Sequence, residues 1–435
     1  MGQFETYIYR DSQKMKKNNL LTFSLLASLP MFCLSKAYAD AQPPTLKING
    51  YTIVSAAIAD QQRTDNGMGG TDPHIAIGAS DLYFTIAGKA ANGMEYKYRI
   101  NFETIPGSDM YINRNYIELN GNFGAFQAGN LKGPEDAMPE SGATIIGGAN
   151  GIDGTLKSVY NFSAGVISGV NFIGETSKST KVVFYSPEVM GFQLGVAYTP
   201  NTSHMGSDDR NNSVQGSGNG AGNSKRIYPD KNKKNQPFGT RNIVVGLTYK
   251  GLVDKWFYQF AAVGITEKSH LALTGVDSQQ QYPVHNANAY QLSAVVGYDQ
   301  WRVAAGWIDN GKSRLPKQPI TVLPLGDTYQ GNAGTAWNLG ASYTVGAYQF
   351  ASAFHRTSRK TDATNRATSD ILVNTVDFSA LQGLKVFGEL DFVKTRTNDK
   401  AKTIQQTYFD QAKNGYKAIG DNAATVFIVG TKVSF

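Results

Sequence analysis

The sequence predicts an all-β protein: a 16-stranded, antiparallel, up-and-down β-barrel that crosses a membrane, with its third external loop folded inward. Three observations support this fold class. Apolar and polar residues alternate with a period of two along most of the chain, the links between these runs are alternately short and long, and the chain ends on a strand with one apolar face. A soluble sandwich could show the alternation, but it has no reason to segregate its loop lengths.

The first 39 residues are expected to be a secretory signal peptide. The basic pair Lys16-Lys17 precedes an apolar run, residues 20–34, and the small-x-small triplet Ala37-Tyr-Ala39 follows it. A positive start, a short apolar run and small residues before the cleavage site are the marks of such a signal. A membrane anchor is the alternative, but the run is short and a proline interrupts it.

Residues 40–435 are predicted to form one barrel domain with nearly balanced charge. Because residues 1–14 carry acids that are unusual in a signal, translation is expected to begin at Met15. Removing residues 1–39 takes five basic and two acidic residues from totals of 41 and 34, which leaves a net charge of +4. This balance gives no reason to expect a nucleic-acid partner. The single cysteine, Cys33, lies in the signal, so disulfides and cysteine nucleophiles are excluded from the barrel.

Sixteen strands follow from the alternation. In residues 94–103, for example, even-numbered positions are apolar or aromatic and odd-numbered positions are polar or charged. Strands of about ten residues, tilted near 45°, span roughly 23 Å, which matches the apolar band of an outer membrane. The predicted strands are 46–59, 76–89, 92–104, 111–121, 123–131, 180–187, 191–199, 241–250, 255–265, 287–298, 301–309, 335–344, 347–357, 370–378, 384–395 and 425–435.

The links between these strands alternate in length. Seven are tight turns and eight are longer, and the longest is residues 132–179. In membrane barrels the short turns face the periplasm and the longer loops face outside, and an even strand number puts both termini on the periplasmic side. A barrel of this size is too wide for its own side chains to fill, so it is expected to enclose an aqueous channel.

The segment 132–179 is expected to fold inward and narrow this channel. It carries acids that would then lie in mid-channel: Glu135, Asp136, Glu140 and Asp153. The expected facing wall is basic: Lys97, Arg99, Arg114 and, on the other side, Arg302. Carboxylates opposite guanidinium groups would set up a field that sorts ions. The alternatives are a solvated loop for the acids and mutual salt bridges for the bases, and both still leave a pore.

Three blocks of sequence resemble those of Gram-negative general porins, especially proteobacterial ones. The block FYSPEVMGFQLGVAYTP at 184–200 and the block NGNFGAFQAGN at 120–130 look like porin segments, the second entering the constriction loop. The block at 427–435 is similar to the porin C-terminus that the barrel-assembly machinery reads. Its apolar face is predicted to be that assembly signal: Phe427, Val429, Val433 and Phe435.

The resemblance runs from about residue 46 to residue 435. It implies a homotrimer of sixteen-stranded barrels in the outer membrane of a Gram-negative bacterium, each with its own pore narrowed by the third external loop. The implied function is passive diffusion of ions and small hydrophilic solutes without a cofactor or a metal, and the implied partners are outer-membrane lipid and the assembly machinery. The segment 132–179 is longer than in general porins and its Pro134-Glu-Asp cluster matches only loosely, so the resemblance implies no ion preference.

Other functions remain open. A substrate-preferring porin would line its path with aromatics for sugars or with lysines for anions, and no inward lysine ladder stands out. A non-conducting surface protein or adhesin would need a plug, for which 132–179 is the only candidate. A barrel hydrolase would need a nucleophile beside a base. Spacing singles out no such partner for the histidines, so an enzyme is not expected: His74, His204, His270, His285 and His355.

Overall fold

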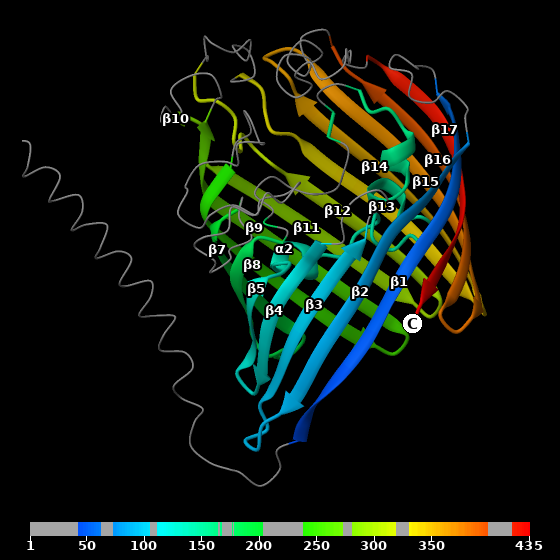
Figure 1. Ribbon diagram of the computed structural model, residues 1–435. Helices are drawn as coiled ribbons and strands as arrows, with labels where there is room; N and C mark the ends of the chain where they lie inside the picture. The colour runs from blue at the N-terminus through cyan, green and yellow to red at the C-terminus, as the bar shows by residue number, and fades with distance from the viewer. Residues whose placement is uncertain are drawn as a thin grey trace, which may run out of the picture.

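The protein forms a closed antiparallel β-barrel of sixteen long strands (Figure 1). The computed structural model describes residues 42–61, 73–104, 111–163, 166–167, 176, 178–202, 238–272, 281–318, 330–398 and 420–435. The strands are β1 (Gln42–Gln61), β2 (His74–Lys89), β3 (Glu95–Thr104), β4 (Tyr111–Gly121), β5 (Gly124–Asn130), β6 (Thr180–Tyr185), β7 (Phe192–Asn201), β8 (Phe238–Val253), β9 (Trp256–Ala272), β11 (Ala287–Tyr298), β12 (Trp301–Asp309), β13 (Thr335–Val345), β14 (Tyr348–Lys360), β15 (Arg366–Leu381), β16 (Leu384–Arg396) and β17 (Asn422–Ser434).

Smaller elements complete the described structure. A two-residue strand, β10 (Gln281–Tyr282), pairs with the end of β9. Three short helices lie between β5 and β6: α2 (Pro134–Ala137), the 3₁₀ turn η2 (Gly151–Asp153) and α3 (Leu156–Val159). No helix in the described residues is long and apolar enough to cross a membrane. The predicted signal peptide and start at Met15 lie outside the described ranges.

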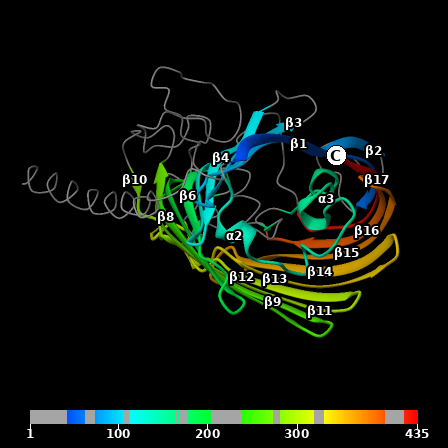
Figure 2. The ribbon, with the colours of Figure 1, turned by 90° about the horizontal axis from the view of Figure 1, so that it is seen from below.

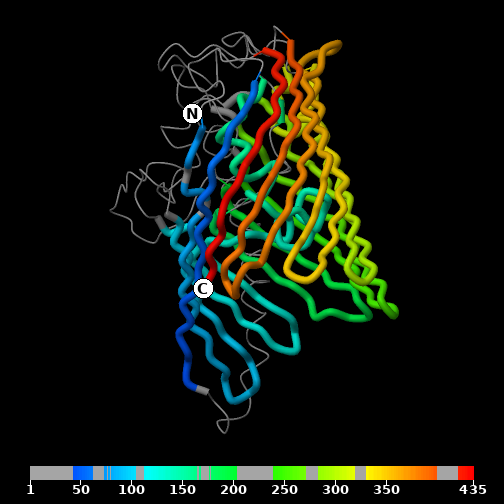
Figure 3. Tube along the Cα trace, turned by 90° about the vertical axis from the view of Figure 1, so that its right-hand side faces the viewer, coloured from blue at the N-terminus to red at the C-terminus, as the bar shows by residue number. Residues whose placement is uncertain are grey.

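The barrel closes where the last strand meets the first. Tyr51 of β1 pairs with Ser434 of β17, and the ladder continues to Gln61 and Ala424. The Phe435 N–H donates to the Gly50 carbonyl and the Gly50 N–H donates to the Phe435 carbonyl, at 3.1 and 3.0 Å. The two strands run side by side in Figure 3. Closure pairs the strand edges, which a bilayer requires because hydrocarbon offers backbone groups no partners.

The barrel is apolar on its outer face. On β13, the outward Trp337 and Leu339 are 41% and 51% exposed, whereas the inward Ala336 and Asn338 are 4% exposed. Aromatic pairs bridge neighbouring strands on the same outer face, such as Trp337 with Phe354 at 5.2 Å between ring centroids. Large exposed apolar side chains on every second residue are what a lipid-facing wall requires.

All sixteen predicted strands are present; several extend beyond the predicted bounds, while those predicted at 92–104, 123–131 and 180–187 are shorter. The predicted strand 370–378 is observed as Arg366–Leu381, and the predicted strand 255–265 as Trp256–Ala272. Beyond the apolar belt the ladder of backbone hydrogen bonds continues into polar residues, where hydropathy no longer alternates. As a result, the link predicted at 358–369 is only residues 361–365.

Candidate functional site

The segment 131–163, between β5 and β6, contacts a long arc of the barrel wall. Seen along the barrel, α2 and α3 lie inside the ring of strands (Figure 2). The segment begins against Gly195 of β7 and Gly246 of β8, which pair with each other. A Cβ on either glycine would lie 2.6–2.7 Å from the Met138 sulfur, so the two bare backbones form a hollow for this side chain. The Met138 carbonyl accepts a hydrogen bond from Gln259 of β9.

Further along, the segment touches the wall backbone to backbone. A Cβ on Gly142 would lie 2.4 Å from the Gly340 nitrogen of β13, and a Cβ on Gly340 would lie 2.7 Å from the Gly142 carbonyl. The Ala143 N–H donates to the Asn338 side chain of the same strand, at 3.3 Å. Glycine on both sides is therefore what permits this close approach.

A value at Gly340 tests this contact. We expect Gly340→Val to displace residues 141–143 from β13, because overpacking of this kind costs about 1–3 kcal/mol. Limited proteolysis of the folded protein should then cut within 131–163 faster than in the parent. Gly388→Val is the matched control, since a Cβ on this strand glycine meets nothing within 4 Å. Equal cleavage of the two variants would contradict the prediction.

The next stretch is held by two carboxylates of the wall. The Gly148 N–H donates to both oxygens of Asp377 on β15, at 3.0 and 3.2 Å. The N–H groups of Ala149 and Gly151 donate to Glu389 Oε2 on β16, at 2.7 and 3.4 Å. Gly148 and Gly151 have φ values of +63° and +53°, which turn successive N–H groups to the same side. This set of contacts is called the carboxylate anchor below.

The segment ends on the strands that close the barrel. Tyr160 is 3% exposed, and its hydroxyl lies 2.7 Å from Thr395 Oγ1 of β16 and donates to the Asn422 carbonyl. Burial raises the pKa of the Tyr160 hydroxyl to about 12. Gln61 of β1 donates to the Val159 carbonyl at 2.8 Å. The segment is thus attached successively to β7–β9, β13, β15–β16 and β1.

The structure places the four predicted acids in this segment and gives three of them a partner. Glu135 is 5% exposed, and its Oε1 accepts from the hydroxyl and N–H of Thr176, at 2.6 and 3.2 Å. Asp136 pairs with Lys132 at 2.6 Å, and Asp153 pairs with Lys157. Glu140 is half-buried and forms no ion pair within the described residues. Lysines four residues away therefore pair two of the carboxylates that the sequence places in mid-channel, and a buried threonine engages one oxygen of a third.

The predicted wall cations divide into two places. Arg99 of β3 and Arg114 of β4 lie close together, because Arg114 pairs with Asn101, two residues from Arg99. The Arg99 guanidinium sits 4.4 Å from the centre of the Tyr83 ring, and neither arginine pairs with a carboxylate of the described residues. Lys97 is paired with Glu118 at 3.0 Å, as the salt-bridge alternative expects. Arg302 lies elsewhere, over Phe257 at the turn end of β12.

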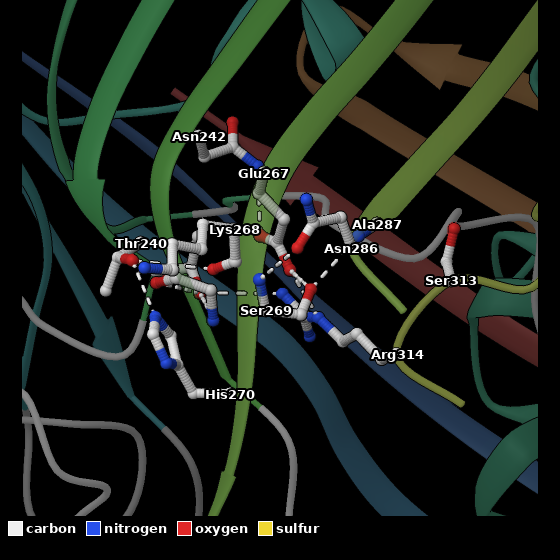
Figure 4. Close-up of polar contacts among 12 residues, drawn as sticks. Thr240, Asn242, Glu267, Lys268, Ser269, His270, Asn286, Ala287, Ser313 and Arg314 are labelled. Atoms are coloured by element: carbon white, nitrogen blue, oxygen red, sulfur yellow. Dashed lines mark hydrogen bonds and ion pairs between the residues drawn. The ribbon is translucent and has the colours of Figure 1, made fainter. Parts of the chain in front are cut away.

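A second polar cluster lies at the loop end of β8 and β9, and the sequence pattern did not single it out (Figure 4). Its centre is Glu267, whose side chain is fully buried. Arg314 Nε donates to Glu267 Oε1 at 2.6 Å, and Ser269 and Asn242 donate to the same carboxylate. The Arg314 N–H also donates to the His285 carbonyl. The pair therefore ties the loop after β12 to the inner wall of β9.

The remaining predicted residues take separate positions. The apolar face of β17 is exposed outward, as expected for lipid contact: Phe427, Val429, Val433 and Phe435. Its role as an assembly signal stays a prediction. His270 contacts Thr240 Oγ1, His285 lies in a loop, and His204 is outside the described residues. No group of three or more His, Cys, Asp or Glu side chains in the described part of the chain is placed to hold a metal ion.

The sequence is similar to known porin and bacterial proteins. A sequence model of the Gram-negative porin family matches residues 26–400. An uncharacterised protein of Rickettsia conorii is 26% identical over 278 residues, which cover 60% of this chain and 58% of that protein. The chain thus spans less than two thirds of the length of this curated relative.

Two solved structures share the fold. An anion-selective porin from Comamonas acidovorans has a TM-score of 0.53 and 13% identity, and the match covers 90% of this chain and all of that one. An outer-membrane protein of Vibrio cholerae, OmpT in its trimer form, has a TM-score of 0.52 and 11% identity, covering 91% of this chain and 100% of that one. At such identities the likeness concerns the closed sixteen-stranded barrel alone.

Proposed function

This chain belongs to the Gram-negative porin family, and from that premise we propose that it is an outer-membrane diffusion channel for ions and small hydrophilic solutes, with a preference for anions. Transport needs no cofactor and no covalent chemistry. The observation that carries the proposal is the segment 131–163, attached along the inside of a barrel whose outer face is apolar. The segment narrows the channel, and the space left beside it passes solutes down their gradients.

Local charge pairing supports the preference for anions. Of the four acids that would attract cations, Asp136 and Asp153 are paired with Lys132 and Lys157, and Glu135 is buried against Thr176, which leaves Glu140. Backbone N–H groups of the segment engage the wall carboxylates of the carboxylate anchor. Arg99 and Arg114, by contrast, face the lumen without a carboxylate partner among the described residues. The net field on a passing ion is therefore positive at this wall.

The proposal includes a biological setting, which the family match supports. The chain is exported by a cleaved signal peptide, residues 1–39, and inserted by the barrel-assembly machinery, which reads the outward face of β17. It assembles as a homotrimer in the outer membrane of a Gram-negative bacterium. The apolar outer wall and the pairing of the C-terminal residue with Gly50 support membrane insertion of a completed barrel.

Conductance and reversal potential of purified protein in planar bilayers test this function together. We expect stable conductance steps, and a reversal potential in a tenfold potassium chloride gradient whose sign shows chloride passing more readily than potassium. The same protein after unfolding by heat serves as the control for detergent artefacts. Silent bilayers would refute the channel, whereas steps with cation preference would refute only the charge argument.

A further inference from the structure

The outer face of the barrel carries a cluster of cations just above the apolar belt on β14, β15 and β16. Five basic side chains occupy outward positions there: Arg356, Lys360, Arg366, Lys394 and Arg396. Their inward neighbours are buried, as for His355 at 0% and Ala367 at 1% exposed, so alternation directs the five side chains outward. The cluster is called the rim patch below.

The ladder places these residues in adjacent rows. Arg356 pairs with Asp370, and Asp370 pairs with Lys394, so the three lie in one row across three strands. Lys360 pairs with Arg366 two rows higher. Neighbouring strands lie about 4.8 Å apart, and successive outward-facing rows lie about 7 Å apart. The patch therefore measures about 10 by 14 Å.

Three acids lie near the rim patch, and each already has a partner. Asp370 forms an ion pair with Arg356 at 3.2 Å, and Asp421 accepts the Thr397 N–H at 2.8 Å. Asp362, in the loop between β14 and β15, is turned into its own loop, where Asn365 and Thr364 donate to it. These hydrogen bonds, led by that of the Asn365 side chain, lower the pKa of Asp362 to about 2. The patch keeps a net positive charge.

The position of the rim patch relative to lipid is set by the row beneath it. Phe354, Leu372 and Phe392 pair across the same three strands, directly below Arg356, Asp370 and Lys394. Phe392 is 45% exposed on the outer face. The patch also lies at the strand ends that residues 361–365 and 397–421 connect. These ends are opposite the short turns, so the patch lies at the outer leaflet. Acyl chains thus meet the aromatic row while headgroups meet the cations.

Other parts of the same rim offer less positive charge. Thr266 of β9 and Asn288 of β11 occupy the outward positions there and hydrogen-bond to each other at 2.9 Å. Asp309 pairs with Thr335 between β12 and β13. The outward cations of β8 and β9 are Arg241 and Lys268, two rather than five. Positive charge at the described rim is therefore concentrated on β14–β16.

We propose that the rim patch is a binding site for the phosphorylated headgroup of an outer-leaflet lipid, whose acyl chains lie on the aromatic row below. Guanidinium groups bind phosphate oxygens in bidentate fashion, and ammonium groups add charge. Clustered basic residues beside a membrane surface attract anionic headgroups in this way. The site is on the outer wall, so it is independent of the channel and of the residues that line it.

Native mass spectrometry of the full chain, titrated with diphosphorylated lipid A in detergent, tests the proposal. Lys394→Gln with Arg396→Gln is expected to weaken binding at least about tenfold, since each basic residue near a surface adds measurable affinity. Arg241→Gln with Lys268→Gln removes the same charge at the same height and should change binding by less than about twofold. Equal loss in the two double variants, or no loss in the first, would overturn the proposal.

Two further arms identify the ligand chemistry. Lipid A treated with phosphatase keeps its acyl chains, and we expect it to bind no better than phosphatidylcholine. Inorganic phosphate should not compete at millimolar concentration, because it lacks the chains that rest on the aromatic row. Binding of the dephosphorylated lipid equal to that of the intact one would overturn the proposal. Unchanged single-channel conductance of the Lys394→Gln, Arg396→Gln variant would show that it folds and that the channel function is unaffected.

Discussion

Replacing Asp377 and Glu389 together with alanine is expected to detach residues 147–151 from the wall and to raise the single-channel conductance. The carboxylate anchor contains charge-assisted hydrogen bonds from Gly148, Ala149 and Gly151. Removing an ionised partner of this kind costs about 1.5–3 kcal/mol per bond. Glu389 and Asp377 are 1% and 2% exposed, so water does not reach these positions in the native arrangement and does not replace the lost hydrogen bonds. The segment should therefore leave the wall more often, with noisier and larger currents.

The isosteric amides separate anchoring from charge. Asp377→Asn with Glu389→Gln removes the same two charges but leaves an oxygen acceptor facing each N–H group. We expect its conductance to remain close to that of the parent, whereas the double alanine variant differs. If both variants change the conductance equally, charge rather than attachment controls the current, and the anchor has no mechanical role.

Neutralising Arg99 and Arg114 with glutamine is expected to shift the channel toward cations. A unit charge about 7 Å from a passing ion in water changes its energy by about 0.6 kcal/mol, or about threefold in the local concentration of that ion. Two such charges change the local concentration of each ion by up to about tenfold, in opposite directions for anions and cations, so the permeability ratio should shift by about tenfold or more. Screening reduces the effect as salt rises, since the Debye length is only about 10 Å at 0.1 M. The measurement is the reversal potential in a gradient from 0.01 to 0.1 M potassium chloride.

The matched control for this pair is Lys394→Gln with Arg396→Gln on the outer wall. It removes the same charge from the protein but lies outside the lumen, so its reversal potential should equal that of the parent. A reversal potential that does not move in the Arg99→Gln, Arg114→Gln variant would contradict the anion preference. A shift of equal size in both variants would assign the effect to overall charge.

Prediction from sequence worked well for the wall and poorly for the loop. Alternation alone placed Arg99 on the inward face of β3 and Phe427 on the outward face of β17, because the direction of a strand side chain depends only on its position in the run. Glu135 has no such rule to follow. It lies in the four-residue helix α2, outside the strands, and its partner is Thr176, 41 residues away.

The carboxylate anchor shows why such contacts could not be predicted from the sequence. Glu389 stands on the polar face of its predicted strand, but nothing in that strand distinguishes a carboxylate in water from one that accepts the Ala149 N–H, 240 residues away. Likewise, Gly142 and Gly340 are ordinary glycines in the sequence, and only their contact shows that both must lack a side chain. Each assignment depends on two distant parts of the chain.

Alternation and turn length were enough to predict the barrel: the number of strands, which face of each meets lipid and where the chain closes on itself. These are local properties, each recognisable within about a dozen residues. The charges available to a passing ion could be identified only once the barrel was closed. Whether Asp377 or Glu389 finds a partner depends on what the closed barrel brings near it, because their donors Gly148 and Ala149 lie 229 and 240 positions away.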